Sequence, residues 1–247
     1  MKKTFSNIIF GRHPVLDAIA AGKTIDKILL QTGTRGELEK EIRQLSRTHN
    51  FAVQFVPKER LSKFAPGNHQ GIIAFVSEIP FFKIEDIVPG IFEKGENPLI
   101  LILEGVTDVR NFGAIARSAE VCGAHAIVIP TKGSAQINAD AVKTSAGALM
   151  KIPVCKEPSL VKTIEYLQQS GIQILASDLQ SGKMIYDLDF TTPVAIIVGA
   201  EDEGVSRALL KMADGTFIIP QKGTTDSLNV SVATGIMLYE ALRQRGS

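Results

Sequence analysis

Hydrophobic and polar positions along the chain are spaced so that they predict strands and helices in turn. Two continuous apolar runs, Leu99–Leu103 and Val194–Val198, are typical of parallel strands that are buried on both faces of a sheet. In Arg35–His49, by contrast, apolar residues such as Leu38 and Ile42 recur at the spacing of one helical face. Because strands and helices alternate, we expect an α/β fold with a mostly parallel sheet.

The first 76 residues alternate on a small scale and are expected to fold as a compact α/β domain. The helices predicted there are Pro14–Ala21, Arg35–His49 and Lys58–Phe64, and the strands are Lys27–Gln31, Phe51–Val56 and Gly71–Val76. From residue 98 onward the alternation is stronger. Besides the two apolar runs, the strands predicted there are Ala126–Ile129, Ile152–Cys155, Ile172–Ala176 and Phe217–Ile219, and the helices are Ala114–Cys122, Ala139–Met150, Ser159–Gln169, Ser206–Met212 and about 228–243.

The stretch between these two parts, residues 77–97, holds two prolines and two glycines among charged residues. Both residue types interrupt regular structure, so we place a linker here, with a short helix at Ile84–Ile91 inside it. The sequence therefore predicts two domains, residues 1–76 and residues 98–247.

Three polar loops follow buried strands in the second domain. In open α/β sheets ligands bind where the carboxyl ends of the strands meet such loops. The loop after Phe217–Ile219 leads through Ser227 and Asn229 into the last helix. We expect Asp226 or Ser227 to cap that helix, because a side-chain oxygen there accepts from a free backbone N–H of the first turn. An ordinary strand–loop–helix unit without a ligand is the alternative.

The other two loops carry different chemistry. The earlier one holds Asn111 as a candidate helix cap, Gly113 where the backbone comes close, and Arg117, whose purely structural role would be an ion pair with Glu120. The later one, GAEDEG at 199–204, places two glycines around three acids. Acids there repel a phosphate, and neither the dinucleotide fingerprint nor the phosphate-loop motif occurs in the chain.

Charge is distributed unevenly, although the net charge is only +1. Residues 1–76 carry 12 Lys and Arg against 6 Asp and Glu, a net charge of +6, whereas residues 77–97 carry −3 and residues 98–247 carry −2. A basic first domain on a slightly acidic remainder indicates a polyanionic partner such as nucleic acid. A solvated surface with a chance imbalance is the alternative.

Composition disfavours several other classes of protein. No apolar run approaches the ~20 residues that span a bilayer, and the opening residues are not typical of a signal peptide. The two cysteines, Cys122 and Cys155, are far apart and support neither a disulfide framework nor a cysteine metal site. The four histidines form no ligand pair at helical spacing, so no metal is expected. We expect a cytoplasmic protein without a membrane partner.

Together the three loops resemble a known family. DVRNFGAIARSAEVCGA, IIVGAEDEGVS and IIPQKGTTDSLNVSVATGIMLYEALR are similar to the three signature motifs of the SpoU/TrmH family of RNA ribose 2′-O-methyltransferases, in that family's order and spacing. The first domain, with IIFGRHPVLDAI and HQGIIAFV, resembles the family's RNA-binding domain, which is similar to ribosomal protein L30e. The layout is closest to members that modify a guanosine of 23S ribosomal RNA. Val109-Arg110 departs from the proline that many members have after the aspartate.

The resemblance implies a fold, a cofactor and an assembly. The second domain would be a SPOUT-type α/β-knot methyltransferase domain, whose C-terminal part forms a deep trefoil knot, and the first would be a small L30e-like α/β domain. S-adenosylmethionine would lie in the knot on backbone groups of Gly199, Ile219 and Leu228, without a metal. The enzyme would be a homodimer with its active site near the subunit interface.

By the same resemblance, five residues would line the reaction centre: Asn111, Arg117, Glu201, Ser227 and Asn229. In the family proposal Arg117 activates the ribose hydroxyl, but a guanidinium stays protonated in proteins. We therefore expect Arg117 to hold the neighbouring phosphate and to stabilise developing alkoxide charge. Glu201 is then the candidate base, or else an anchor for loop backbone N–H groups, and Asn229 orients the ribose or the loop.

The choice of RNA is expected to come from the first domain, because every RNA nucleotide carries a 2′-hydroxyl. Arg12, His13 and His69 are the candidate RNA contacts, with packing of the small domain as their alternative role. Three other functions stay open: a tRNA 2′-O-methyltransferase of the same family, a non-catalytic RNA-binding module that kept the fold, and a nucleotide-binding oxidoreductase. Intact motif residues count against the second, and the absent dinucleotide fingerprint counts against the third.

Overall fold

The structure is a computed structural model that describes residues 7–65, 67–224 and 227–246, and the chain divides into two compact units. One unit comprises residues 1–80 with 136–138, and the other comprises 81–135 and 139–247. The division along the chain therefore lies within the stretch at 77–97 that is rich in prolines and glycines.

The first unit is built on a four-stranded mixed sheet with the strand order β1-β4-β2-β3. Its elements are β1 (Ile8–Phe10), α1 (Arg12–Ala20), β2 (Ile25–Gln31), α2 (Glu37–Thr48), β3 (Ala52–Val56), α3 (Lys58–Phe64) and β4 (Ile72–Val76). β2 and β3 are parallel, and β4 runs antiparallel to both β1 and β2. One face of the sheet packs on α1 and α2 through Val15 and Ile42, and the other packs on α3 through Leu61.

The second unit is built on six parallel strands in the order β10-β8-β9-β5-β6-β7. The strands are β5 (Leu99–Leu103), β6 (Ala126–Pro130), β7 (Val154–Glu157), β8 (Gln173–Ser177), β9 (Val194–Val198) and β10 (Gly215–Phe217). The helices are α4 (Ile84–Glu93), α5 (Val109–Val121), α6 (Ala139–Thr144), α7 (Leu160–Gln169), α8 (Arg207–Leu210) and α9 (Val230–Arg245), with short 3-10 turns η1 (Ala148–Met150) and η2 (Ile185–Asp187).

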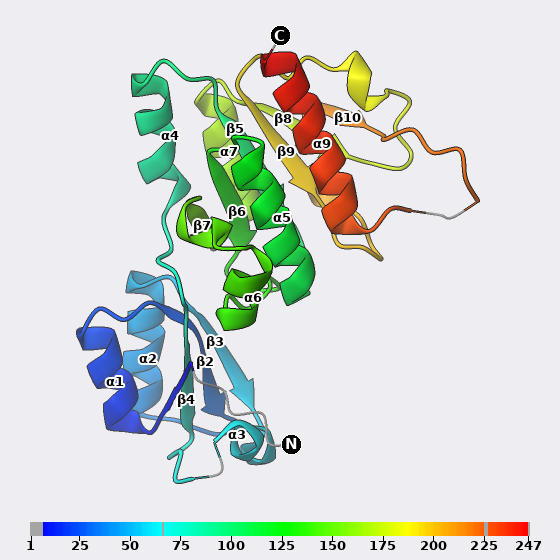
Figure 1. Ribbon diagram of the computed structural model, residues 1–247. Helices are drawn as coiled ribbons and strands as arrows, with labels where there is room; N and C mark the ends of the chain where they lie inside the picture. Colours follow the sequence, from blue (N-terminus) through cyan, green and yellow to red (C-terminus); the bar gives the residue numbers. More distant parts are fainter. Residues whose placement is uncertain (1–6, 66, 225–226, 247) are drawn as a thin grey trace. The chain divides into compact units, whose positions relative to one another are not determined.

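Helices cover both faces of this sheet (Figure 1). Ile100 and Ile102 of β5 pack with residues of α4, α7 and α8 on one face. Since side chains alternate along a strand, Leu101 points to the other face, where α5 and α9 lie side by side. All residues of β5 and β9 are buried, which confirms the α/β fold predicted from the two apolar runs.

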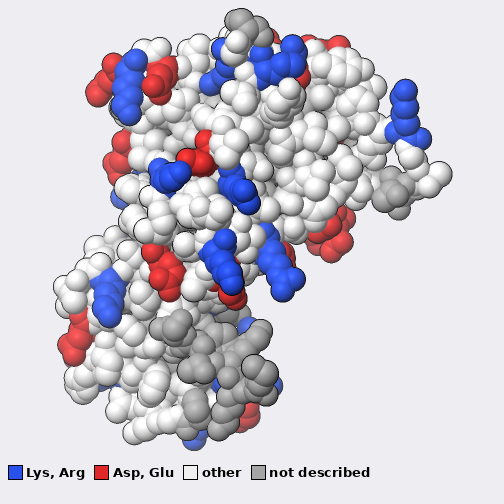
Figure 2. Space-filling view, viewed as in Figure 1, with Lys and Arg blue, Asp and Glu red and all other residues white. Residues whose placement is uncertain are grey.

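Charged side chains lie mostly on the surface. Figure 2 shows Lys, Arg, Asp and Glu interspersed with large uncharged areas on the face drawn. Within the described part of the chain, three charged residues are buried: Asp26 in the first unit, and Lys156 and Glu157 at the end of β7. The Lys156 ammonium lies 4.5 Å from the centre of the Phe81 ring, an arrangement typical of a cation–π contact.

The residues around Phe81 extend the sheet at its β7 edge. The Phe82 N–H donates to the Val154 carbonyl at 3.0 Å, and the Phe82 carbonyl accepts from the Lys156 N–H at 3.2 Å. Glu157 Oε1 accepts from the Ile84 N–H at 2.9 Å, where α4 begins. This edge of the sheet is therefore paired with the chain's own backbone, as protein edges generally need to be.

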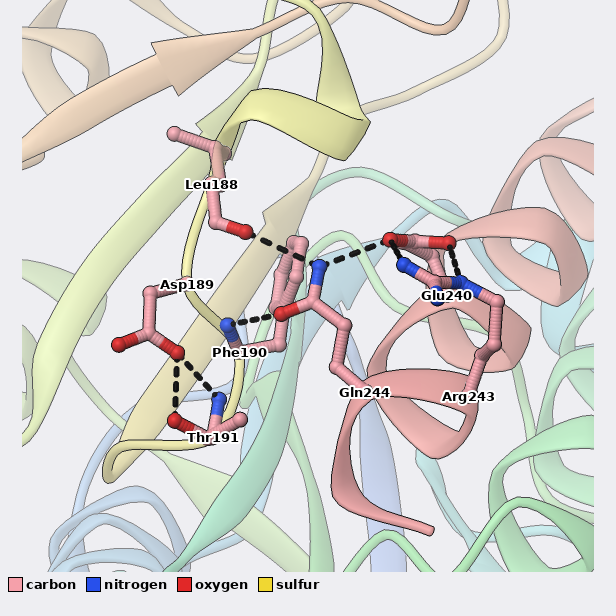
Figure 3. Close-up of polar contacts among 7 residues, drawn as sticks. All are labelled: Leu188, Asp189, Phe190, Thr191, Glu240, Arg243 and Gln244. Carbon is pink, nitrogen blue, oxygen red and sulfur yellow. Dashed lines mark hydrogen bonds and ion pairs between the residues drawn. The ribbon is translucent and has the colours of Figure 1, made fainter. Parts of the chain in front are cut away.

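The C-terminal end of α9 is fastened to the segment that precedes β9 (Figure 3). Gln244 accepts from the Phe190 N–H at 2.8 Å and donates to the Leu188 carbonyl at 3.0 Å. The adjacent guanidinium of Arg245 donates to four backbone carbonyls at 2.6 to 2.9 Å, those of Asn97, Pro98, Phe190 and Thr192. One helix end thus ties together the chain segments that lead into β5 and β9.

Several predicted elements have different boundaries, and two of these differences have a clear local reason. The strand predicted at Phe217–Ile219 ends at Phe217, because Ile218 leaves the sheet and forms a bridge with Met184. The helix predicted at Ala139–Met150 stops at Thr144. It stops there because Ala146 and Gly147 adopt φ angles of 50° and 83°, and a right-handed helix does not continue through positive φ.

Candidate active site

Two helix caps differ from the sequence prediction. Asp108, rather than Asn111, caps α5, since its carboxylate accepts from the N–H groups of Arg110 (2.9 Å) and Asn111 (2.8 Å). Asn229, rather than Asp226 or Ser227, caps α9, and its Oδ1 accepts from the Ser231 N–H at 3.0 Å. Asp226 itself lies outside the described residues. Both predictions were wrong because the helices begin at residues that periodicity did not resolve.

These two caps bring polar side chains from three loops together. Asn229 Nδ2 donates to Asn111 Oδ1 at 3.2 Å and lies 3.4 Å from Glu201 Oε1. Asn111 Nδ2 donates to Glu201 Oε2 at 3.4 Å. Three of the five residues expected at the reaction centre therefore form one hydrogen-bonded cluster. Each of the three retains contact with solvent.

The loop that carries Glu201 is a tight turn on the end of β9. The Gly204 N–H donates to the Ala200 carbonyl at 2.9 Å, and Gly204 itself has a φ of 66°. A Cβ on Gly199 would overlap the backbone of Gly204 and Val205. Only glycine therefore fits at residue 199, which accounts in physical terms for the first glycine of GAEDEG.

A cavity of about 380 Å³ opens beside the cluster, in the range of about 300–1,000 Å³ typical of small-molecule sites. Its lining includes all three residues expected to hold the cofactor, namely Gly199, Ile219 and Leu228, together with Glu201 and Ser227. Apolar walls come from Phe217 of β10 and from Ala233 and Met237 of α9. The cavity is thus formed mainly by the second and third polar loops.

The sequence prediction missed one wall of this cavity. The cavity is also lined by the last residue of β8, Ser177, and by the three residues that follow it, Asp178, Leu179 and Gln180. The sequence did carry a signal, because these residues come at the end of, or directly after, a buried strand that ends at the same edge of the sheet.

Gly113 lies where α5 crosses α6. A Cβ added to Gly113 would stand 2.7 Å from the Thr144 Cβ and 2.9 Å from the Ala141 carbonyl oxygen. Close approach of the two helices therefore requires glycine at this position, as expected from the sequence. The contact fixes the first turns of α5, from which Asn111 extends.

Arg117 does not join the cluster. Its side chain is exposed on α5, does not line the cavity, and makes no hydrogen bond or ion pair with any residue that the structure describes. The structural alternative of an ion pair with Glu120 is not found either, since Glu120 pairs with Lys151 at 3.1 Å. Ser227, likewise exposed, lines the cavity without a hydrogen bond to the cluster.

The candidate RNA contacts of the first unit differ in accessibility. His13 is exposed at the start of α1. The Arg12 guanidinium is partly exposed and lies 3.6 Å from both Glu37 and Glu41. His69 is buried, and its Nδ1 accepts from the Gly71 N–H at 3.1 Å. The ring of His69 therefore orders its own turn, the packing role considered for it above.

An α/β protein with a small-molecule cavity and a polar cluster at the carboxyl edge of a parallel sheet has the features of an enzyme of the doubly wound class. Residues 98–239 match the SpoU rRNA methylase family, and residues 8–82 match the substrate-binding domain of RNA 2′-O ribose methyltransferases. The chain belongs to the SpoU family of RNA methyltransferases.

Individual relatives agree with this assignment. The chain is 36% identical over 244 residues to the 23S rRNA (guanosine-2′-O-)-methyltransferase RlmB of Yersinia pestis, covering 98% of each chain. An AdoMet-bound rRNA methyltransferase from Sinorhizobium meliloti has a TM-score of 0.61 and 25% identity, over 96% of this chain and 86% of that one. The TrmH/SpoU tRNA modifying enzyme of A. aeolicus has a TM-score of 0.57 and 33% identity, over 61% of this chain and 77% of that one.

Two further properties concern the described residues alone. None of the helices traced through residues 7–65, 67–224 and 227–246 has the length and apolarity that a bilayer crossing requires. In the same residues no three His, Cys, Asp or Glu side chains gather as a metal site.

Proposed function

We propose that this protein transfers the methyl group of S-adenosylmethionine to a ribose 2′-hydroxyl of RNA, on a guanosine of 23S ribosomal RNA. The observation that carries the proposal is the placement of the Asn111–Glu201–Asn229 cluster at the rim of the cavity. A methyl acceptor bound at the cluster lies next to whatever fills the cavity. Alignment of two reactants in this way supplies much of the acceleration of a bimolecular reaction.

The cavity suits S-adenosylmethionine in size and in lining. Backbone groups of Gly199, Ile219 and Leu228 would hold it, with Phe217 and Met237 as apolar walls. When bound, it supplies an electrophilic methyl group on a sulfonium. The acidic loop that contains Glu201 suits a cation better than a phosphate.

The chain's own residues have distinct roles in this proposal. Asn111 and Asn229 orient the ribose and hold the Glu201 carboxylate between their amides. Glu201 is the candidate base that accepts the hydroxyl proton, since its carboxylate is exposed and lies beside both asparagine amides. Ser227 completes the rim, and Arg117 holds the phosphate beside the reacting ribose.

A homodimer forms part of the proposal. Val232, Ile236 and Tyr239 of α9 lie three or four residues apart, on one side of the helix, and are 52%, 38% and 62% exposed. Val121, at the end of the neighbouring α5, is 68% exposed. Such an apolar surface is characteristic of an interface between subunits. A second copy placed there would bring its own residues close to Arg117, which this chain leaves without a partner among the described residues.

We also propose that the C-terminal part of the chain is knotted. The Phe217 carbonyl accepts from the Asp178 N–H at 2.9 Å, and the Ile218 N–H donates to the Lys183 carbonyl at 2.9 Å. Leu188 and Phe190 are in turn held at the end of α9 by Gln244. The segment between β8 and β9 therefore contacts the chain both before and after the third loop, which is consistent with threading of that loop through the segment.

Ribosomal RNA is preferred over tRNA because a relative that matches over 98% of its length is named a 23S rRNA methyltransferase, whereas the tRNA-modifying neighbour covers 61% of the chain. The test incubates the purified protein with tritiated S-adenosylmethionine and unmodified ribosomal RNA or unmodified tRNA in parallel. Label on a ribose of ribosomal RNA is the expected result. Label on tRNA alone would overturn the substrate while keeping the chemistry.

A matched control uses the Asn229→Ala variant, which is expected to lose label on either RNA. No label on either RNA, with S-adenosylmethionine still bound by the wild type, would overturn naked RNA as the substrate and lead to the same assay on ribosomal precursor particles. Absence of both label and binding would favour a non-catalytic RNA-binding module.

A further inference from the structure

Glu104 directly follows β5 and contacts the residue that follows the Glu201 loop. Its backbone N–H donates to the Val198 carbonyl at 2.9 Å, which continues the ladder between β5 and β9. Its carboxylate Oε2 accepts from the Ser206 N–H at 2.8 Å. Glu104 is half-buried and does not line the cavity. It therefore touches neither of the reactants.

Ser206 marks the far end of the cavity loop. All seven residues from Gly199 to Val205 line the cavity. Ser206 is the N-cap of α8, and its Oγ accepts from the Leu209 N–H at 3.4 Å. The bond from Glu104 thus holds the loop at the point where it returns to regular structure. At the other end, the loop is fixed by the register of β9 on β5.

The turn that follows Glu104 also supports the loop. A Cβ added to Gly105 would stand 3.1 Å from the Ala200 Cβ, so the turn after β5 lies directly against the second residue of the loop. The loop itself carries Glu201, Asp202 and Glu203, all exposed. Because three neighbouring carboxylates repel one another, the loop depends on external anchors to keep its shape.

We infer that Glu104 is a positioning residue for methyl transfer: by holding the Ser206 N–H, its carboxylate fixes the 199–205 loop, and with it Glu201 beside Asn111 and Asn229. The inference rests on the proposed function. It adds a residue outside the cavity that sets the geometry of both the cofactor wall and the candidate base. A hydrogen bond from a backbone N–H to a carboxylate is of the strong, charge-assisted kind.

A double-mutant cycle tests the bond itself. Glu104→Ala removes the acceptor, and Ser206→Pro removes the donor at a residue whose φ of −61° already suits proline. Ser206→Ala is the matched control, because it removes the Oγ cap of α8 and keeps the N–H. Glu104→Gln keeps an uncharged acceptor and is expected to fall between the wild type and Glu104→Ala. For each variant we would measure folding by circular dichroism, the Kd for S-adenosylmethionine by calorimetry, and kcat and both KM values.

Glu104→Ala and Ser206→Pro are each expected to lower kcat/KM for S-adenosylmethionine about tenfold to a hundredfold, the effect of losing a hydrogen bond to a charged group. KM and Kd for S-adenosylmethionine rise, whereas KM for RNA stays unchanged. The double variant is no worse than either single variant, because the same bond is lost. Ser206→Ala keeps the wild-type KM for S-adenosylmethionine.

Additive defects in the double variant, or a defect of equal size in Ser206→Ala, would overturn the inference. So would a fall in kcat that equals the loss of folded protein measured by circular dichroism, with KM and Kd for S-adenosylmethionine unchanged. Measurements of binding and methylation by the wild-type protein distinguish failure of this inference from failure of the proposed function. A wild-type protein that binds S-adenosylmethionine and methylates no RNA contradicts the function, while the Kd series still decides the role of Glu104. A wild-type protein that does not bind it overturns both.

Discussion

The side-chain amide of Asn229 makes hydrogen bonds with both its oxygen and its nitrogen. Its oxygen caps α9 by accepting from the Ser231 N–H (3.0 Å) and from Ser231 Oγ (2.6 Å). Its nitrogen donates to Asn111 and lies near Glu201. An aspartate would cap the helix equally well, but would place a second carboxylate against Glu201. The requirement for asparagine therefore comes from the cluster and not from the helix.

Arg117 lies outside the cluster, and its role in the reaction is tested separately. We predict that Arg117→Ala lowers turnover on RNA by about a hundredfold, the size of a lost donor to developing negative charge, and leaves the Kd for S-adenosylmethionine unchanged. Single-turnover kinetics and calorimetry would measure the two quantities. Arg110→Ala is the matched control, since it removes an exposed cation from the same helix. Unchanged turnover in Arg117→Ala would remove this residue from the mechanism.

Gly199 tests the loop geometry. Gly199→Ala is expected to cost about 3 kcal/mol or more of unfolding free energy, because its Cβ overlaps the backbone of Gly204 and Val205. Urea denaturation would measure the loss, and binding of S-adenosylmethionine is expected to be lost with it. Gly182→Ala serves as the control, since nothing lies within 4 Å of a Cβ at that position. Equal stability of the two variants would contradict the described loop.

At the scale of elements, α9 runs from the site to the segments that lead into β5 and β9. Asn229 at its first turn belongs to the cluster, and Val230, Ala233 and Met237 line the cavity. Its last turn is held by Gln244 and Arg245 (Figure 3 shows the Gln244 contacts). The helix is therefore fixed at both ends. We expect that loss of the C-terminal contacts would also change the position of the residues that line the cavity.

The C-terminal anchor of α9 gives a prediction about stability. Arg245→Ala removes the guanidinium donor from four backbone carbonyls, of which that of Pro98 keeps the Val194 N–H, and is expected to cost about 2 to 3 kcal/mol. Arg243→Ala, in the same turn, removes an exposed ion pair with Glu240 and is expected to cost less, because exposed pairs contribute little to stability. The urea denaturation midpoints of the two variants would measure this difference. A larger loss of stability in Arg243→Ala than in Arg245→Ala would contradict the role of Arg245 as the anchor.

The start of α4 gives a prediction about pH. Burial, with added repulsion from Glu85 and Asp86, raises the pKa of Glu157 above its ordinary 4.5, although the bond from the Ile84 N–H lowers it. A raised folded pKa favours the protonated acid, so this contribution to stability is present below about pH 4.5 and is lost as pH rises through the folded value. Glu157→Gln keeps an acceptor without the charge.

We therefore expect Glu157→Gln to be more stable than the wild type at pH 8, with a difference that shrinks as the pH falls toward 4. Thermal unfolding across this range would measure it. Glu157→Ala, which loses the acceptor for Ile84, is expected to be less stable than Glu157→Gln at every pH. A Glu157→Gln variant that is destabilised at pH 8 would show that the ionised form is required.

The sequence predicted those elements that are specified by a pattern of neighbouring residues. The apolar runs located β5 and β9 correctly, and the rule that ligands bind after such strands located the loops of Asn111, Glu201 and Asn229. β1, with three residues, was too short to show periodicity. The Arg245 anchor was not predictable, since its acceptor Asn97 lies 148 residues away and no pattern in either segment identifies the pair.

At the scale of the whole molecule, the two units have different roles in the proposed function. The first unit carries the basic excess, +6 over residues 1–76, and matches a substrate-binding domain of RNA methyltransferases. The second carries the cavity and the cluster. RNA shape and unpaired bases would be read by the first unit, because the 2′-hydroxyl is common to every nucleotide. His13, exposed at the start of α1, is the most accessible of the three candidate contacts there.

The central claim is methyl transfer to a ribose oxygen, and identification of the modified nucleoside tests it most directly. Unmodified 23S ribosomal RNA would be incubated with the protein and with S-adenosylmethionine that carries a deuterated methyl group, then digested to nucleosides and analysed by mass spectrometry. Labelled 2′-O-methylguanosine, absent with the Asn229→Ala variant, is the predicted result. A deuterated methyl group on a base, with none on ribose, would contradict the account.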